Sequence, residues 1–212
     1  MGLRSRAFAL TYDRFMAAGE KAGLAETRAQ LLADSTGAVL EVGAGTGLNV
    51  AHYPRSVSTL TLAEPDSAML RRLERAAARV SMPVTVLRAP AEDLPYDDNT
   101  FDTVVSTLVL CGVDDQPRAV REIGRVLKPG GQLLFIEHVR SDDDHLARRQ
   151  DRLNWFNRLT TNCDCNRPTL RTLDHGGFVV DHLRLGELPK SPSFVRPMIV
   201  GRATRPADAL TA

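Results

Sequence analysis

The chain has 212 residues, 43% of them hydrophobic and 25% charged, which are ordinary values for a globular protein with one core. The formal net charge of +1 gives no electrostatic reason to expect a nucleic-acid partner, and no apolar run approaches the ~20 residues of a membrane-spanning helix. Three cysteines are too few for a disulfide framework, which favours a reducing compartment.

Residues 1–36 contain apolar side chains at the spacing of one helix face. They are Phe8, Tyr12, Phe15 and Met16. Two compatible interpretations stay open: a helix packed on the edge of the domain, or a lid over a bound ligand with Tyr12 reaching the site. A third is a helix lying on a membrane surface, with its arginines facing the lipid headgroups.

The stretch from Ala38 to Gly47 is the most informative part of the chain. A short apolar run ends at Glu41-Val42, and glycines follow at 43, 45 and 47. A dinucleotide-binding G-x-G-x-x-G would need glycine at 48, where the chain has Leu48. Glycines at alternate positions allow a sharp turn and let a ligand lie against bare backbone. The alternative is a strand-to-helix turn that binds nothing.

A second apolar run ends at Glu64, the position from which Rossmann-like folds bind ribose hydroxyls. A carboxylate can accept hydrogen bonds from two hydroxyls at once. The alternative is a solvated carboxylate at a turn, which is common ahead of a proline such as Pro65.

From residue 38 the pattern alternates between strand and helix, which predicts parallel strands with helices on both faces. We expect strands at 38–42, 58–63, 84–88, 102–106 and 132–137, followed by β runs at 178–185 and 194–203. We expect helices near 47–52, 66–80, 115–127, 142–160 and 168–175.

Four motifs in this order resemble those of the class I S-adenosylmethionine (SAM)-dependent methyltransferases, from residue ~10 to ~205. They are the glycine loop, Glu64, the segment Ala91-Glu92-Asp93-Leu94-Pro95, and Phe101–Val105 ahead of Leu127-Lys128-Pro129-Gly130-Gly131. The resemblance implies a Rossmann-like α/β fold, with a seven-stranded, mostly parallel sheet whose last strand is antiparallel. It also implies SAM as cofactor, S-adenosylhomocysteine as product, and these cofactor-binding residues: Glu41, Gly43, Ala44, Gly45, Gly47, Asn49, Glu64, Pro65, Met69, Ala91, Glu92, Thr107 and Leu108.

Three further segments look like the small thiol methyltransferases of the methyltransferase-like group. They are Ser106–Cys111, Phe135–Val139 and Cys163 through Thr169. The resemblance implies a small, mostly apolar acceptor, with a thiol as first choice. A quinone or phenol methylated on carbon or oxygen is the second, phosphatidylethanolamine the third, and a SAM-binding sensor without catalysis the rival outside enzymes.

Methyl transfer from a sulfonium needs an aligned nucleophile and a base for it, and no metal. His138, past the end of the fifth strand, is the best candidate base, with Asp164 as a second and Tyr12 as a third catalytic candidate. The bland alternatives are a histidine satisfied by the backbone and an aspartate that caps a helix. We place Cys111, Cys163 and Trp155 at the substrate pocket, although each could equally be a packing residue. Cys163-x-Cys165 lacks the second pair of a zinc site, so no metal is expected.

We therefore expect N-terminal lid helices over 1–36, a single methyltransferase domain over 37–205 and a tail over 206–212. The expected partner is a small acceptor, with no nucleic acid and no integral membrane segment. Peripheral membrane contact and the choice between monomer and homodimer stay open. Arg outnumbers Lys by 24 to 3, which is typical of a GC-rich bacterial genome, and the expected location is the cytoplasm.

Overall fold

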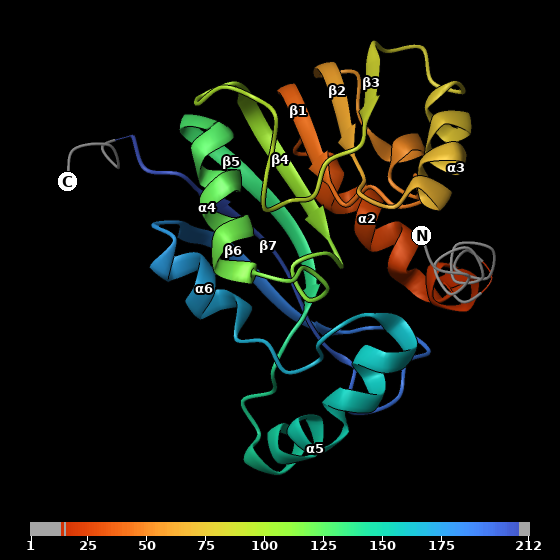
Figure 1. The fold of residues 1–212 in the computed structure, drawn as a ribbon, viewed down its shortest axis with the longest axis vertical. Helices are drawn as coiled ribbons and strands as arrows, with labels where there is room; N and C mark the ends of the chain where they lie inside the picture. The colour runs from red at the N-terminus through yellow and green to blue at the C-terminus, as the bar shows by residue number, and fades with distance from the viewer. Residues whose placement is uncertain (1–13, 15, 208–212) are drawn as a thin grey trace.

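Strands and helices alternate along the chain in a computed structural model that describes residue 14 and residues 16–207 (Figure 1). The strands are β1 (Gly37–Val42), β2 (Val57–Ala63), β3 (Val84–Leu87), β4 (Phe101–Thr107), β5 (Leu127–His138), β6 (Val179–Glu187) and β7 (Pro197–Thr204). The helices are α2 (Ala25–Leu32), α3 (Ser67–Ala77), α4 (Gln116–Val126), α5 (Asp144–Thr161) and α6 (Thr169–His175), with a π-helical turn η1 (Glu20–Leu24) and a 3₁₀ turn η2 (Val50–His52).

All seven strands form one sheet in the order β3-β2-β1-β4-β5-β7-β6. Strands β1 to β5 run parallel, and β7 is antiparallel to both of its neighbours. The predicted mostly parallel, seven-stranded sheet with an antiparallel last strand is therefore confirmed. The strand order reverses between β1 and β4, and ligands of open α/β sheets bind outside the carboxyl ends of the strands at such a point.

Helices cover both faces of the sheet, with α2 and α3 on one face and α4 and α6 on the other (Figure 1). On α3, Leu73 is fully buried against Val39 and Leu62 of the sheet. On α4, Val120 and Ile123 are buried in the core of the opposite face. The side chains of β strands alternate between the two faces, so consecutive residues of one strand supply both cores.

The helix predicted near 47–52 is wrong in extent, because only the 3₁₀ turn η2 forms there. Gly47 has φ +87°, outside the helical region, and Tyr53 is extended ahead of Pro54. A residue before proline is disfavoured in the helical conformation, which leaves no room for a longer helix. The chain between the loop and β2 is consequently a compact turn.

The carboxyl ends of β1 to β5 face the region occupied by α5 and the segment that follows it (Figure 1). Asp143 caps α5 by accepting a hydrogen bond from the Leu146 amide, and Asn162 ends it in the left-handed conformation. Among the described residues, no helix combines the length and the apolar character needed to cross a bilayer. The elements beyond the strand ends therefore frame the candidate site.

Candidate functional site

The three glycines of the loop after β1 differ in what surrounds them. All three glycines have positive φ, between +57° and +87°. A Cβ at Gly43 would lie 2.6 Å from the Val109 side chain, and one at Gly47 would lie 2.7 Å from the Ala76 Cβ. At Gly45 the nearest atom would be 3.9 Å away. Gly43 and Gly47 therefore permit close packing, whereas Gly45 presents bare backbone to a cavity.

Glu64, the predicted ribose acceptor, lies beside this loop at the end of β2. Its two carboxylate oxygens accept hydrogen bonds from the amides of Gly45 and Asp66, each at 2.8 Å. Burial raises the pKa of Glu64 and these two amides lower it, with a net rise. Pro65 is exposed, and Met69 is buried on α3.

A buried polar network fills the space between the loop and the end of β4. Arg28 donates from Nη1 to Asn49 Oδ1 and Thr107 Oγ1, both at 2.9 Å. Asn49 donates from Nδ2 to Glu41 Oε1 at 2.9 Å, and the Tyr53 hydroxyl donates to Glu41 Oε2 at 2.7 Å. Burial raises the pKa of Glu41 to about 7, against these two hydrogen bonds, which lower it.

Sequence reasoning missed Arg28, which is 2% exposed and also pairs with Glu20 at 3.1 Å. One signal was available: Arg28 follows Leu24 by four residues and precedes Leu32 by four, so it interrupts an apolar helix face. A cation in an apolar stripe needs a buried partner, and here the partners lie at the ends of β1 and β4.

These groups line a cavity with about 240 Å³ of empty space, part of it open to solvent. Its lining includes six of the predicted cofactor residues and the unpredicted Arg28, Thr46 and Leu48; the six are Glu41, Gly43, Ala44, Gly45, Asn49 and Thr107. Thr107 closes it from the end of β4. We call this the loop cavity.

The Ala91-Glu92 segment lies elsewhere. Ala91 is buried in the core under α4. Glu92 accepts hydrogen bonds from the amides of Asp114 and Asp115, at 2.8 and 3.3 Å. Its carboxylate therefore holds the turn ahead of α4, and it does not line the loop cavity.

Leu108 follows the last residue of the loop cavity's lining and itself lines a second cavity. It has φ +59°, a strained conformation for a branched side chain, and its amide donates to the Ile136 carbonyl at 2.7 Å. Thr107 lines the loop cavity and Leu108 lines the second cavity, so consecutive residues at the end of β4 border the two cavities.

The second cavity, here the apolar cavity, contains about 1340 Å³ of empty space, part of it open to solvent. Its lining is mostly apolar, with His138 and Cys163 at the sheet end; the apolar residues are Met16, Leu108, Phe156, Leu188, Pro192, Phe194 and Val195. Trp155 was expected here, but the structure places it outside, 67% exposed and edge-on against Phe156. The next residue of α5, Phe156, lines the cavity instead and is 49% exposed. Tyr12 lies outside the described residues.

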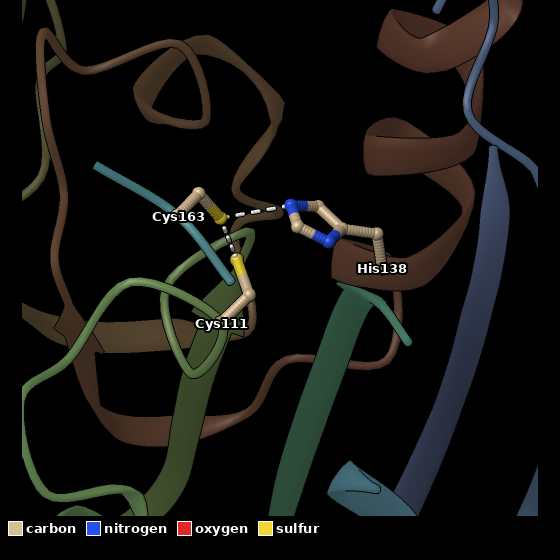
Figure 2. A group of neighbouring side chains, drawn as sticks. All are labelled: Cys111, His138 and Cys163. Carbon is tan, nitrogen blue, oxygen red and sulfur yellow. Dashed lines mark hydrogen bonds between the residues drawn. The ribbon is translucent and has the colours of Figure 1, made fainter. Parts of the chain in front are cut away.

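Three side chains from distant segments meet at the inner end of the apolar cavity (Figure 2). Cys111 follows β4, His138 ends β5 and Cys163 follows α5. The Cys163 Sγ lies 2.7 Å from the Cys111 Sγ and 2.8 Å from the His138 Nε2. Cys111 is fully buried and His138 is 5% exposed. We call them the Cys-His-Cys cluster.

Burial raises the pKa of the Cys111 thiol well above its usual value, and the neighbouring Cys163 raises it further. Burial lowers the pKa of His138, but the charges of Cys111, Glu137 and Asp164 outweigh it and raise the pKa overall. Among the described groups, His138 Nδ1 has no hydrogen-bond partner. The imidazole therefore contacts Cys163 through Nε2, and its second nitrogen has no partner in the part of the chain that the structure describes.

Glu137 holds the turn that carries Cys111 and does not orient His138. Its Oε1 accepts hydrogen bonds from the Ser106 hydroxyl and from the amides of Val109 and Leu110, at 2.8 to 3.1 Å. The side chain is fully buried. It fixes the loop between the end of β4 and Cys111 against the end of β5.

Asp164, predicted as a second base, lies among three hydrogen-bond donors. Its carboxylate accepts hydrogen bonds from Asn154, Arg158 and Arg167, the closest at 2.6 Å. Burial raises the pKa of Asp164, but the Arg167 and Asn154 hydrogen bonds outweigh it and hold the pKa below the usual value. A carboxylate held ionised by two guanidinium groups is a poor proton acceptor, so these contacts favour a structural role for Asp164 over that of a base.

The same contacts fasten the Cys163 segment to the Cys111 turn. The Asp164 amide donates to the Cys111 carbonyl at 2.8 Å, and Arg167 donates to the Leu110 and Val113 carbonyls at 3.1 and 2.7 Å. Cys165, by contrast, is buried against α5. The two cysteines that lie side by side are therefore Cys111 and Cys163, and not Cys163 and Cys165, which are near neighbours in the sequence.

Residues 40–135 match the methyltransferase domain family. A human thiol S-methyltransferase is 32% identical over 179 residues, covering 79% of this chain and 70% of that protein. The chain belongs to the class I SAM-dependent methyltransferases. A ubiquinone/menaquinone biosynthesis C-methyltransferase of Idiomarina loihiensis is 38% identical over 47% of this chain and 41% of that protein.

Solved structures agree with the fold of this methyltransferase. A SAM-dependent methyltransferase of Thermotoga maritima, described as a possible histamine N-methyltransferase, has a TM-score of 0.71 at 24% identity. The match covers 97% of this chain and 100% of the other. At this identity the likeness concerns the fold.

SAM is the cofactor of this methyltransferase, and the chemistry of the residues around the loop cavity is compatible with it. Gly45 leaves open the space that any side chain would fill, at the strand end where open α/β sheets bind ligands. Glu64 offers a carboxylate beside this loop, and Arg28 offers a cation in the lining of the cavity. The described residues thus present an acceptor for hydroxyls and a partner for a carboxylate.

Proposed function

We propose that this methyltransferase methylates small apolar thiols on sulfur. The observation that carries the proposal is that consecutive residues, Thr107 and Leu108, border the two cavities, with His138 and Cys163 in the lining of the apolar one. A cavity with a mostly apolar surface and a small number of polar groups suits a small lipophilic molecule with one reactive atom. The similarity to human thiol S-methyltransferases supports sulfur as that atom.

In the loop cavity we assign two ends to the chain's own residues. Glu64 would accept hydrogen bonds from the ribose hydroxyls, and Arg28 would pair with the amino-acid carboxylate. Bound SAM supplies an electrophilic methyl group: the acceptor sulfur, its proton lost to solvent, forms a bond to the methyl carbon as the carbon–sulfonium bond breaks and its electron pair stays on the leaving sulfur. Positioning by these residues supplies much of the rate.

The apolar cavity contributes by excluding water and aligning the acceptor. Its wall is formed by α5 and by the segment before β7, both beyond the strand ends. A charged acceptor would lose its hydration there, and no Asp, Glu, Lys or Arg among the described residues of the lining would compensate its charge. We therefore expect turnover to rise with the apolar character of the thiol.

The N-terminal segment would complete both cavities, in keeping with a lid. Met16 lines the apolar cavity and Arg28 lines the loop cavity. Both precede the catalytic domain proposed for 37–205. Their side chains link cofactor and acceptor through one segment.

His138 meets the acceptor as part of the cluster and not as a free imidazole. Its Nε2 already lies 2.8 Å from the Cys163 Sγ. A direct role as base would require the acceptor to displace Cys163. The role of His138 as sole base therefore stays a prediction, separate from the proposal of thiol methylation.

A panel of acceptors tests the proposed function. The full chain is incubated with SAM and with benzyl mercaptan, mercaptoethanol, a hydroquinone or phosphatidylethanolamine vesicles, and S-adenosylhomocysteine is quantified. We expect turnover with benzyl mercaptan above mercaptoethanol, and none with the others. Turnover of the hydroquinone alone would move the acceptor to carbon or oxygen, and cofactor binding without any turnover would indicate a sensor.

A further inference from the structure

Resting on the proposed function, we propose that Cys111, His138 and Cys163 bind a zinc ion whose fourth position takes the acceptor thiolate. The three ligand atoms all lie within 4.8 Å of one another, on residues from three distant segments (Figure 2). Two cysteines and one histidine form a donor set used by catalytic zinc, which keeps one position open for substrate. Thiolate and imidazole ligands also favour zinc over magnesium or calcium.

The surroundings hold each ligand in place, as metal sites require. Glu137 fixes the turn before Cys111 through its bonds to the Val109 and Leu110 amides. Asp164, clamped by Arg167, fixes the segment of Cys163 and ties it to the Cys111 carbonyl. The pairing of His138 with Met198 of β7 fixes the backbone from which the imidazole projects, and its Nδ1 has no partner among the described groups.

The open side of the cluster faces the acceptor. His138 and Cys163 line the apolar cavity, while Cys111 is fully buried behind them. Within the part of the chain that the structure describes, a fourth ligand would reach the cluster from that cavity, through which the acceptor enters in the proposed function.

Zinc also answers the electrostatic problem of a thiolate in an apolar cavity. The two cysteine thiols lose their protons to solvent on binding, so the ion with two thiolates and a neutral imidazole carries no net charge. Burying the ion with these three ligands is therefore far less costly than burying a free charge. An acceptor thiolate at the fourth position brings the net charge to −1, and its bond to the cation, together with the positive sulfonium of bound SAM, would stabilise it there. An acceptor thiol bound at the fourth position loses its proton to solvent as well, because a coordinated thiol is deprotonated.

Binding requires the site to open. With zinc–sulfur bonds of about 2.3 Å in a tetrahedral site, two sulfurs lie about 3.8 Å apart, and Cys111 and Cys163 lie 2.7 Å apart here. Cys163 is only partly buried and borders the apolar cavity, so its side chain has room to move.

Zinc titration of the full chain against a chromophoric chelator, in a phosphine reductant, tests the site. We expect about one zinc ion per chain, and a loss of affinity above the ~10–100-fold typical of an outer partner in Cys111→Ser and in Cys163→Ser. Cys165→Ser is the matched control, because Cys165 is a buried cysteine outside the cluster; it should bind zinc like the wild type.

Cobalt substitution reads the same site in the unmodified chain, so the test does not depend on variants that fold. Cobalt should give a thiolate-to-metal absorption band, and benzyl mercaptan should change the cobalt spectrum without SAM. Absence of zinc binding with three free thiols would overturn the proposal. So would a mass two hydrogens lower with two thiols missing, which would show a Cys111–Cys163 disulfide.

Activity separates this site from the proposed function. Zinc binding without turnover of any thiol would support the metal site and overturn the acceptor. Equal turnover of thiols by zinc-free and zinc-loaded protein would leave thiol methylation standing and overturn the role of zinc.

Discussion

Gly45→Ala separates ligand binding from folding at the glycine loop. Gly45 has φ +57°, and an added Cβ would meet no atom closer than 3.9 Å. The cost in unfolding free energy is therefore the backbone strain alone, ~1–2 kcal/mol. The methyl group would, however, project where the cofactor approaches the backbone. Overpacking of that kind costs ~1–3 kcal/mol, or about 5–150-fold in affinity.

The chain offers a matched control in Gly177, which follows α6. It has φ +81° and nothing within 4 Å of an added Cβ. Gly177→Ala should lose a similar unfolding free energy and keep full cofactor affinity. Gly47→Ala, whose Cβ would lie 2.7 Å from that of Ala76, should lose more stability than either.

Urea unfolding gives the stabilities, and calorimetric titration with S-adenosylhomocysteine gives the affinities. We expect Gly45→Ala to match Gly177→Ala in unfolding free energy and to bind S-adenosylhomocysteine more weakly than it does. Equal S-adenosylhomocysteine affinity in these two variants and the wild type would refute the assignment of Gly45 as the ligand-facing glycine.

Two further predictions concern a buried acid and the apolar wall. Burial raises the pKa of Glu41 from 4.5 to about 7 in the folded protein, so the native state binds this proton more tightly than the unfolded chain does. The resulting contribution to the unfolding free energy is complete below pH ~4.5 and is lost as the pH rises to ~7. Between pH 5 and pH 7 the wild type should lose on the order of 1–3 kcal/mol more unfolding free energy than Glu41→Gln does, as measured by urea unfolding. The same pH dependence in both proteins would contradict this. Phe156→Ala should raise KM for benzyl mercaptan about 5–30-fold through ~1–2 kcal/mol of lost apolar contact, with a much smaller effect of Trp155→Ala; equal effects would show that Phe156 does not line the acceptor site.

Periodicity and motif order predicted the sheet because strand burial is a local property of the sequence. The apolar run at 58–63 has the pattern of a strand, and the segment after it has the pattern of a helix, so both elements could be predicted from the sequence. The observed strand β2 spans Val57–Ala63. The helix at 47–52 failed for a local reason as well. Gly47 has a positive φ on one side of it, and Pro54 disfavours a helical conformation on the other side. The prediction of a strand-to-helix turn took neither into account.

The site was only partly predictable, because its contacts join distant residues. The loop glycines and Glu64 are adjacent to their strands, and strand ends share one edge of the sheet. The distance between Cys111 and Cys163 depends on how α5 and its following segment fold back. The partners of Asp164 could not be predicted for the same reason, since only the fold brings Arg158 and Arg167 to its carboxylate.

The central claim is that the acceptor atom is a sulfur, and a competition measures it most directly. The full chain receives SAM with a trideuterated methyl group and an equimolar mixture of benzyl mercaptan, benzylamine and a hydroquinone, and mass spectrometry identifies every product with the label. The account predicts label in benzyl methyl sulfide, with S-adenosylhomocysteine in equal amount. Label in the amine or the hydroquinone, with none in the sulfide, would contradict it.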